Sequence, residues 1–174
     1  MITVISGTNR ADSNTIKVAR KYYEYLQTQE VAVQLFDLTE LPLDFINPQM
    51  YGERAASFEA IQEKYLFPTE KYVVVVPEYN GSFPGIFKLL IDASDIAKAF
   101  HGKKASLTGV AAGRAGNLRG LDTLTNMLNY IKMDVCQIKL PISGINGLLK
   151  EDGSFSHEDT LKVMHSQMDL FLKM

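Results

Sequence analysis

Residues 6–15 (SGTNRADSNT) gather hydrogen-bond donors between a short apolar stretch and the start of a helical pattern. A strand that leads into a helix at about residues 13–15 presents free backbone N–H groups and the positive end of the helix dipole, which together favour an anion. Helix capping would explain one or two of the polar residues here, whereas an anion site would explain six. The side chains expected to contribute are those of Ser6, Thr8, Arg10, Ser13, Asn14 and Thr15.

This first loop contains neither of the common glycine-rich phosphate motifs. It lacks G-x-G-x-x-G, which lets the backbone approach a pyrophosphate, and G-x-x-x-x-G-K-[ST], which cradles a nucleoside triphosphate. A terminal phosphate monoester is therefore the anion that the loop fits best.

A second polar loop, residues 77–85 (PEYNGSFPG), follows an apolar stretch directly. Its Asn80-Gly81 pair is typical of a tight turn whose backbone can lie flat against a ligand, and prolines stiffen both ends. Tyr79 and Phe83 add aromatic surface, so a planar heteroaromatic ring could rest there and bond the loop N–H groups. An ordinary Asn-Gly turn is the alternative reading of that dipeptide alone.

Residues 111–120 (AAGRAGNLRG) form a third loop with three glycines and two arginines, Arg114 and Arg119. Glycines let a backbone approach a ligand closely, although they could equally shape a turn between a strand and a helix. Together with the other two loops, this segment predicts a third wall of the same site.

The elements that must position these loops are strands and helices in alternation. Five stretches rich in β-branched residues, mostly apolar on both faces, read as buried parallel strands. Apolar residues spaced by three and four predict the helices, and Ser156 with Asp159 resembles a start signal for the last one. The strands are residues 1–6, 31–36, 72–77, 104–111 and 135–142, and the helices lie near 16–26, 55–65, 85–100, 121–131 and 161–171.

This alternation predicts one doubly wound α/β domain over residues 1–174. Five parallel strands commonly take the order 2-1-3-4-5, and ligands then bind outside the carboxyl ends of strands 1 and 3, where the winding reverses. The three polar loops follow strands 1, 3 and 4, so we expect them to meet at that edge.

Composition excludes several classes of function. The net charge of −2 and the scattered basic residues give no bulk attraction to nucleic acid or to an anionic membrane. No apolar run is long enough to span a bilayer, and the N-terminus has no secretory signal, so a cytoplasmic location is expected. The single cysteine, Cys136, is expected to pack in the core, and the three histidines lack metal-ligand spacing, so no metal site is predicted.

The motifs SGTNRADSNT, PEYNGSFPGIFKLLID and GRAGNLRG, in this order and spacing, resemble the NADPH-dependent FMN reductase family. This flavodoxin-like group includes quinone, azo-dye and chromate reductases. The resemblance implies non-covalent FMN with its phosphate in the first loop. Many relatives have an Asp-Trp pair where this chain has Asp92-Ala93, and the chain has no tryptophan. The resemblance places the isoalloxazine ring against Pro77, Glu78, Tyr79, Asn80, Gly81 and Ser82, and its pyrimidine edge near Gly113, Arg114 and Ala115.

The function so implied is an NAD(P)H-dependent flavin oxidoreductase. NADPH or NADH would be the donor, and the acceptor a quinone, an azo compound, chromate or free flavin. FMN would carry the redox chemistry, so no catalytic side chain is obligatory. The arginines of the three loops outnumber their carboxylates, which suits an anionic dinucleotide. The alternatives are a flavodoxin-type electron carrier and, less favoured, a hydrolase with Ser82 or Ser143 as nucleophile.

The pattern of residues 85–100 (GIFKLLIDASDIAKAF) also bears on assembly. Apolar residues surround almost the whole axis of this predicted helix, so one face could cover the sheet while the other meets a partner. We expect a homodimer through this helix, or a homotetramer. The family resemblance implies that residues 41–54 of the neighbour edge the ligand cleft.

Overall fold

The β-branched stretches form one parallel sheet in the computed structural model, which describes residues 1–174. The strand order β2-β1-β3-β4-β5 confirms the predicted winding, with β1 and β3 adjacent at the centre. β3 and β4 are buried along almost their whole length, as expected for strands covered on both faces. The strands are β1 (Ile2–Ser6), β2 (Val33–Asp37), β3 (Lys71–Pro77), β4 (Lys104–Val110), β5 (Asp134–Val135) and β6 (Leu140–Ile142).

The prediction of one final strand over residues 135–142 was wrong, because the chain divides there into β5 and β6. β5 pairs with the start of β4 and β6 with its end, and residues 137–139 leave the ladder after Cys136, whose N–H still donates to Ala105 (2.8 Å). The amide of Gln167 fills the gap: its Nε2 donates to the carbonyl oxygens of Leu107 (3.1 Å) and Ile138 (3.2 Å). A side chain thus supplies a donor to carbonyls beside the interruption.

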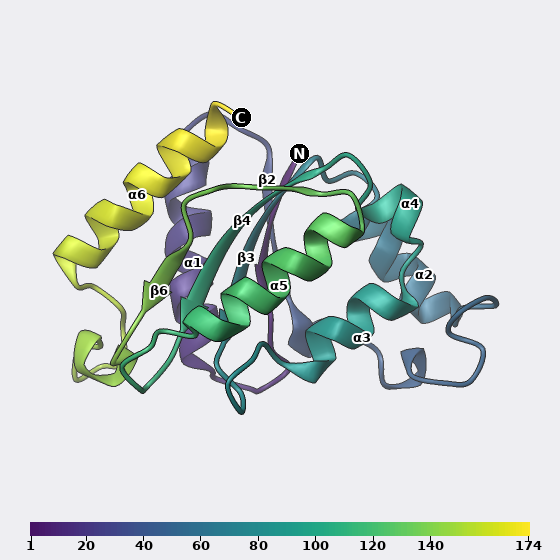
Figure 1. Ribbon diagram of the computed structural model, residues 1–174, viewed down its shortest axis with the longest axis horizontal. Helices are drawn as coiled ribbons and strands as arrows, with labels where there is room; N and C mark the ends of the chain where they lie inside the picture. The colour runs from purple at the N-terminus through teal and green to yellow at the C-terminus, as the bar shows by residue number, and fades with distance from the viewer.

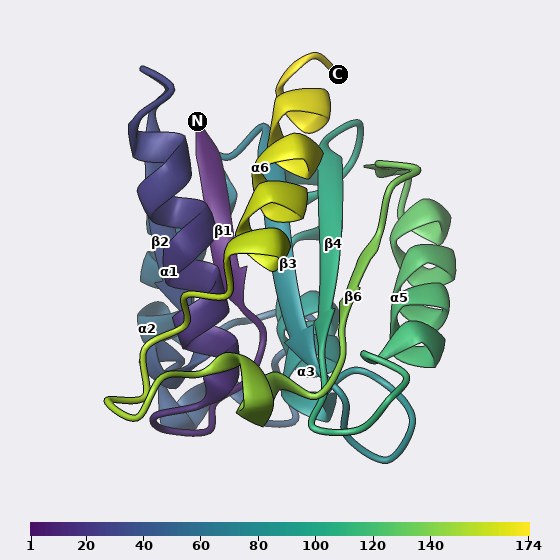
Figure 2. The ribbon, with the colours of Figure 1, turned by 90° about the vertical axis from the view of Figure 1, so that its left-hand side faces the viewer.

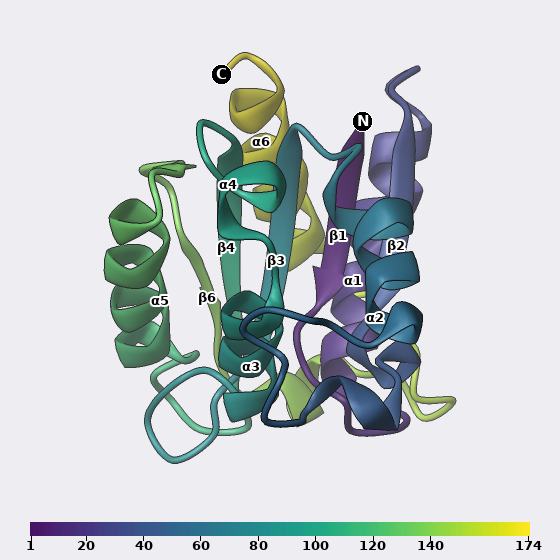
Figure 3. The ribbon, with the colours of Figure 1, turned by 90° about the vertical axis from the view of Figure 1, so that its right-hand side faces the viewer.

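Helices cover both faces of the sheet (Figure 1). α1 and α6 lie together on one face (Figure 2), and α2 to α5 lie on the other (Figure 3). Cys136 packs in the core beneath α1 and α6, as expected. The helices are α1 (Asn14–Gln27), α2 (Ala56–Ile61), α3 (Gly85–Ala93), α4 (Ile96–Ala99), α5 (Leu118–Tyr130) and α6 (Glu158–Leu172); a π-helical turn, Gln62–Leu66, follows α2, and 3-10 turns are at Leu38–Glu40, Leu43–Phe45 and Ile145–Leu148.

Two predicted helices differ in detail. The helix expected over residues 85–100 breaks into α3 and α4, because Ser94 is extended and Asp95 caps a new helix by accepting from the N–H of Lys98. The last helix begins after His157 rather than at Ser156, since the His157 ring nitrogen accepts from the N–H of Thr160. Apolar spacing located both segments and missed the capping side chains.

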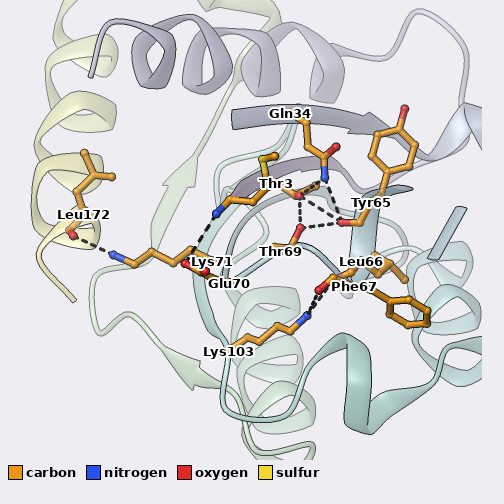
Figure 4. Close-up of polar contacts among 11 residues, drawn as sticks. Thr3, Gln34, Tyr65, Leu66, Phe67, Thr69, Glu70, Lys71, Lys103 and Leu172 are labelled. Carbon is orange, nitrogen blue, oxygen red and sulfur yellow. Dashed lines mark hydrogen bonds and ion pairs between the residues drawn. The ribbon is translucent and has the colours of Figure 1, made fainter. Parts of the chain in front are cut away.

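Lysines bind helix ends at the amino edge of the sheet, opposite the predicted ligand edge (Figure 4). Lys103 Nζ donates to the carbonyl oxygens of Leu66 (2.9 Å) and Phe67 (3.3 Å), at the end of the π-helical turn. Lys71 Nζ donates in the same way to Leu172 (2.8 Å), at the end of α6. A cation at a helix C-terminus satisfies its free carbonyls and complements the helix dipole. Burial lowers the pKa of Lys103 to about 8.

Candidate active site

A cavity of about 500 Å³ opens at the carboxyl edge of the sheet, where the loops at the bottom of Figures 2 and 3 meet. It lies where the winding reverses, as the strand order predicted. Its walls come from the first loop, the start of the second, the end of β4 and the turn after β6. They consist of Arg10, Ala11, Asp12, Ser13, Asn14, Glu78, Tyr79, Val110, Ala111, Ala112, Ile145 and Asn146.

The first loop ends in the amino terminus of α1, which faces this cavity. Ser13 caps the helix, its Oγ accepting from the N–H of Ile16 (3.2 Å). A helix leaves its first N–H groups without intrahelical acceptors, and this cap satisfies only one of them. The first turn of α1 holds no acidic side chain, so no carboxylate of the helix itself offsets the positive end of its dipole, although Asp12 and Glu78 line the same cavity. Free N–H groups at the start of α1 therefore face the cavity where the sequence predicts an anion.

The hydroxyl groups predicted for this site divide into two sets. Ser13 lines the cavity, whereas Ser6, Thr8 and Thr15 are buried and do not belong to its lining. Thr8 Oγ1 accepts from the N–H of Arg10 (3.3 Å) and hydrogen-bonds the Tyr79 hydroxyl (2.9 Å), so it joins the first loop to the second. Ser6 lies at the end of β1, level with Asp37 of β2 in the strand register.

The second loop forms a tight hairpin. Tyr79 and Ser82 exchange backbone hydrogen bonds of 2.9 and 3.1 Å, and both intervening residues, Asn80 (φ 53°) and Gly81 (φ 77°), have positive φ. Asn-Gly is the dipeptide that this turn geometry favours, because Gly and Asn tolerate positive φ most readily. Glu78 and Tyr79 line the cavity, and Pro77 is buried beneath them.

The third loop reaches the cavity earlier than expected. Ala111 and Ala112 line it, whereas the predicted residues 113–115 continue outward and are exposed. Arg114 and Arg119 are exposed as well. The strand end therefore supplies the wall, while the residues predicted to meet the ligand stand beyond it.

Sequence reasoning missed the wall formed by Ile145 and Asn146. Asn14 Nδ2 donates to Asn146 Oδ1 (3.0 Å), which ties the start of α1 to the turn after β6. The Ile145 N–H donates to the carbonyl of Ala111 (3.1 Å), so the same turn is fixed to the end of β4. The signal was available, because the carboxyl end of the last predicted strand must lie at this edge too.

No group of three or more His, Cys, Asp or Glu side chains is placed to hold a metal ion. His157 hydrogen-bonds Thr160 (2.9 Å), and His165 stacks on Tyr25 with ring centroids 4.0 Å apart. Neither histidine lines the cavity, and neither do Ser82 and Ser143.

Comparison with known families decides the class of this site. The family model of NADPH-dependent FMN reductases matches residues 1–145, most of the chain and all three loops. The chain belongs to the NADPH-dependent FMN reductase family. It is an NAD(P)H-dependent oxidoreductase that uses FMN, and its fold is flavodoxin-like.

Individual relatives of this FMN reductase agree with that assignment. A quinone reductase of Pseudomonas putida is 25% identical over 173 residues, which are 98% of this chain and 91% of the relative. An FMN-dependent NADPH-azoreductase of Staphylococcus aureus is 27% identical over 116 residues, 63% of this chain and 60% of the relative. In fold, the chain is similar to the flavoenzyme FerB of Paracoccus denitrificans, an NAD(P)H:(acceptor) oxidoreductase. The TM-score is 0.77 and the identity 22%, and the match covers 99% of this chain and 94% of FerB.

Proposed function

We propose that the cavity at the ends of β1, β3 and β4 binds FMN non-covalently and serves the reduction of small acceptors, quinones foremost, with azo compounds, chromate and free flavin as further candidates. The observation that carries this proposal is the capped amino terminus of α1, which opens into a cavity of about 500 Å³. A helix amino terminus attracts a phosphate, and the hairpin of the second loop offers a flat backbone beside it.

The residues fit FMN in two parts. At the phosphate end, Arg10 and Asn14 line the cavity beside the free N–H groups of α1, and both carry side-chain donors. At the ring end, Glu78 and Tyr79 line the cavity, and the adjoining turn is open at Gly81, since nothing lies within 4 Å of the position that a Cβ there would take. Residues 113–115 stand farther out, where the pyrimidine edge of the ring would lie.

FMN, when bound, supplies the redox chemistry by taking a hydride from a nicotinamide and giving two electrons to an acceptor. The chain binds and orients it. Backbone N–H groups of the second and third loops are fixed donors for negative charge at the ring, and donors already in place stabilise charge without reorganising. Tyr79, hydrogen-bonded to Thr8, holds the two loops together beside the cavity and keeps water from that side.

The charge around the cavity favours a reductase over a carrier. Arg10, Arg114 and Arg119 are exposed around this edge, against the exposed carboxylates of Asp12 and Glu78. Positive charge raises the local concentration of an anionic dinucleotide. Dependence on NADPH or NADH and a single unpaired cysteine, Cys136, favour a cytoplasmic enzyme. No helix of the structure has the length and apolar character needed to cross a membrane.

We also propose that two copies associate through α3 and α5. Phe87 and Leu90 of α3 are buried in the core, so the apolar surface is smaller than the sequence suggested. A groove of about 540 Å³ remains between the two helices. Tyr51 from the segment 41–54 and Tyr130 at the end of α5 border it and are 72% and 88% exposed. Aromatic side chains around an apolar groove are typical of protein interfaces.

An anaerobic titration tests the reductase. NADPH or NADH, added to FMN-loaded protein without oxygen, should bleach the visible flavin absorbance, and benzoquinone should restore it. If neither nucleotide bleaches the flavin while a separate reductase does, the chain is an electron carrier. If the purified protein binds no FMN at all, the assignment of the cavity is wrong.

A further inference from the structure

Asn117 lies between the third loop and the hairpin of the second loop, and sequence reasoning gave it no role. It is the residue before α5, has positive φ (65°) and is 1% exposed. Its Nδ2 donates to the backbone carbonyl oxygens of Pro77 (2.9 Å) and Val76 (3.3 Å). Both carbonyls belong to the last two residues of β3, directly before the hairpin.

Two glycines, Gly109 and Gly120, pack directly against the side chain of Asn117. A Cβ on Gly109 of β4 would lie 2.9 Å from the Cβ of Asn117. A Cβ on Gly120 of α5 would lie 2.8 Å from the carbonyl carbon of Ser82 and closer still to the Asn117 amide. Contacts below 3 Å are excluded for real side chains, so these two positions accept only glycine while Asn117 and the hairpin stay in place.

The chemistry of the contact requires an amide. Carbonyl oxygens accept hydrogen bonds only, so the atom facing Val76 and Pro77 must be the nitrogen. The amide oxygen, Oδ1, is buried without a partner, above the first turn of α5, where the positive end of the helix dipole lies. A carboxylate in the same position could not donate and would face two carbonyl oxygens across a buried contact.

We propose that Asn117 is a positioning residue for the flavin, acting through the hairpin of residues 78–82. It does not line the cavity. It fixes the end of β3 to the start of α5, and so sets where the hairpin backbone stands relative to the ring. The proposal rests on the FMN site proposed above, because the hairpin is the part of that site that would face the ring.

Two variants distinguish the effect of the Asn117 side-chain amide from the effect of its backbone conformation. Asn117→Gly keeps the positive φ and removes the amide, and Asn117→Asp keeps the shape and removes the donor. Lys132→Gly is the matched control, since Lys132 also has positive φ (61°) and lies beyond the other end of α5. Both Asn117 variants should weaken FMN and riboflavin equally, by about tenfold, the usual worth of one or two lost hydrogen bonds. The control should bind both flavins like the wild type.

Hydrogen exchange in the flavin-free protein gives a second readout. Amides of residues 78–82 should exchange about tenfold faster in Asn117→Gly than in the wild type or in Lys132→Gly, because the hairpin loses its anchor. The midpoint potential of bound FMN should shift as well, which loss of stability alone would not cause.

The outcomes distinguish the two proposals. Unchanged exchange in the hairpin, or flavin affinities within twofold of the wild type, would show that Asn117 does not position the loop. Faster exchange in a protein whose wild type binds no FMN would support the anchoring and refute the flavin site. A loss for FMN larger than for riboflavin would place the effect at the phosphate and overturn the proposal.

Discussion

Single side chains at the carboxyl edge of the sheet divide into those that face the cavity and those that hold its walls. Arg10 and Asn14 face it, while Thr8 and Asn117 hold loops in place from buried positions. Residue type does not tell these roles apart, because a threonine or asparagine serves either purpose. The direction of the side chain decides, and the fold sets that direction.

Arg10→Ala should distinguish the contribution of the phosphate to flavin binding from that of the ring. A hydrogen bond to a charged group contributes about 1.5–3 kcal/mol, so FMN should bind roughly ten- to a hundredfold more weakly. Riboflavin, which has no phosphate, should bind as it does to the wild type. A fluorescence-quenching titration with both flavins measures the two affinities. An equal loss of affinity for FMN and riboflavin would contradict the assignment of the first loop to the phosphate.

In the first two loops the sequence predicted the local backbone geometry but not which side chains line the cavity, since Ser6, Thr8 and Thr15 are buried outside its lining. The donor-rich segment before α1 and the Asn-Gly turn have local signatures, so Ser13 as helix cap and the tight hairpin could be predicted. The wall formed by Ile145 and Asn146 depends on how the chain continues after β6, and no local pattern marks it. Its position follows from the sheet rather than from its residues.

At the scale of elements, the structure depends on side chains that complete backbone hydrogen bonding. The side-chain amide of Gln167, on α6, donates to the Leu107 carbonyl where the ladder beside β4 is interrupted. Its Oε1 accepts from the Tyr22 hydroxyl (2.5 Å) and from the Thr108 hydroxyl (3.3 Å). Burial raises the pKa of Tyr22, so its hydroxyl stays protonated as a donor. One amide therefore joins α1, α6 and the sheet.

Gln167→Leu should destabilise the protein by about 2–3 kcal/mol. Leucine has a similar size but leaves the buried carbonyl of Leu107 without its side-chain donor, and it leaves the Tyr22 hydroxyl with Thr108 (2.7 Å) as its remaining partner. The free energy of unfolding in urea measures the effect. Gln27→Leu, at an exposed site on α1, is the control and should stay within about 0.5 kcal/mol of the wild type. A Gln167→Leu protein as stable as the wild type would show that the ladder does not need this amide.

Lys103 should make stability depend on pH. The unfolded chain keeps the proton on this amine up to its ordinary pKa of 10.5, whereas the folded chain releases it at about 8. Between about pH 8 and pH 10 the unfolded state binds more protons, so the free energy of unfolding contributed by Lys103 rises with pH. We expect a rise of about 1 kcal/mol, below the full value of the pKa shift because the amine is only partly buried.

Urea unfolding at about pH 7.5 and pH 9.5 checks this effect of Lys103. Lys103→Met should lack the contribution, so the difference in stability between wild type and variant should change with pH in the stated direction. Lys162→Met, at an exposed position on α6, should follow the wild type at both pH values. A parallel pH dependence in Lys103→Met and the wild type would contradict the expectation.

At the scale of the whole molecule, the cavity and the lysines that bind helix ends lie at opposite ends of the sheet. The cavity and its loops lie at the carboxyl edge, and the lysines that bind helix ends lie at the amino edge, near both chain termini (Figures 2 and 4). The layers between them follow from alternating strand and helix patterns, which is why the winding could be predicted. The broken last strand could not, because a side chain distant in sequence, Gln167, stabilises the break.

Association of two copies is a property of the whole molecule and can be tested by mass. Light scattering at micromolar concentration should give twice the chain mass of 19.5 kDa, or four times if dimers pair. Tyr130→Glu, which puts a charge beside the groove of α3 and α5, should give the monomer, because an unpaired charge in an interface is costly. Leu170→Glu, on the opposite layer, should still give at least the dimer. A monomeric wild type would refute the association.

The division of the last strand into β5 and β6 also protects the protein against aggregation. A regular edge strand offers a row of free N–H and C=O groups on which another chain can add as a further strand. Here β5 has two residues, residues 137–139 leave the ladder, and β6 contains Pro141, which has no N–H. This edge is a poor template for sheet growth. Even at high concentration, this side of the sheet therefore contributes little risk of fibril formation.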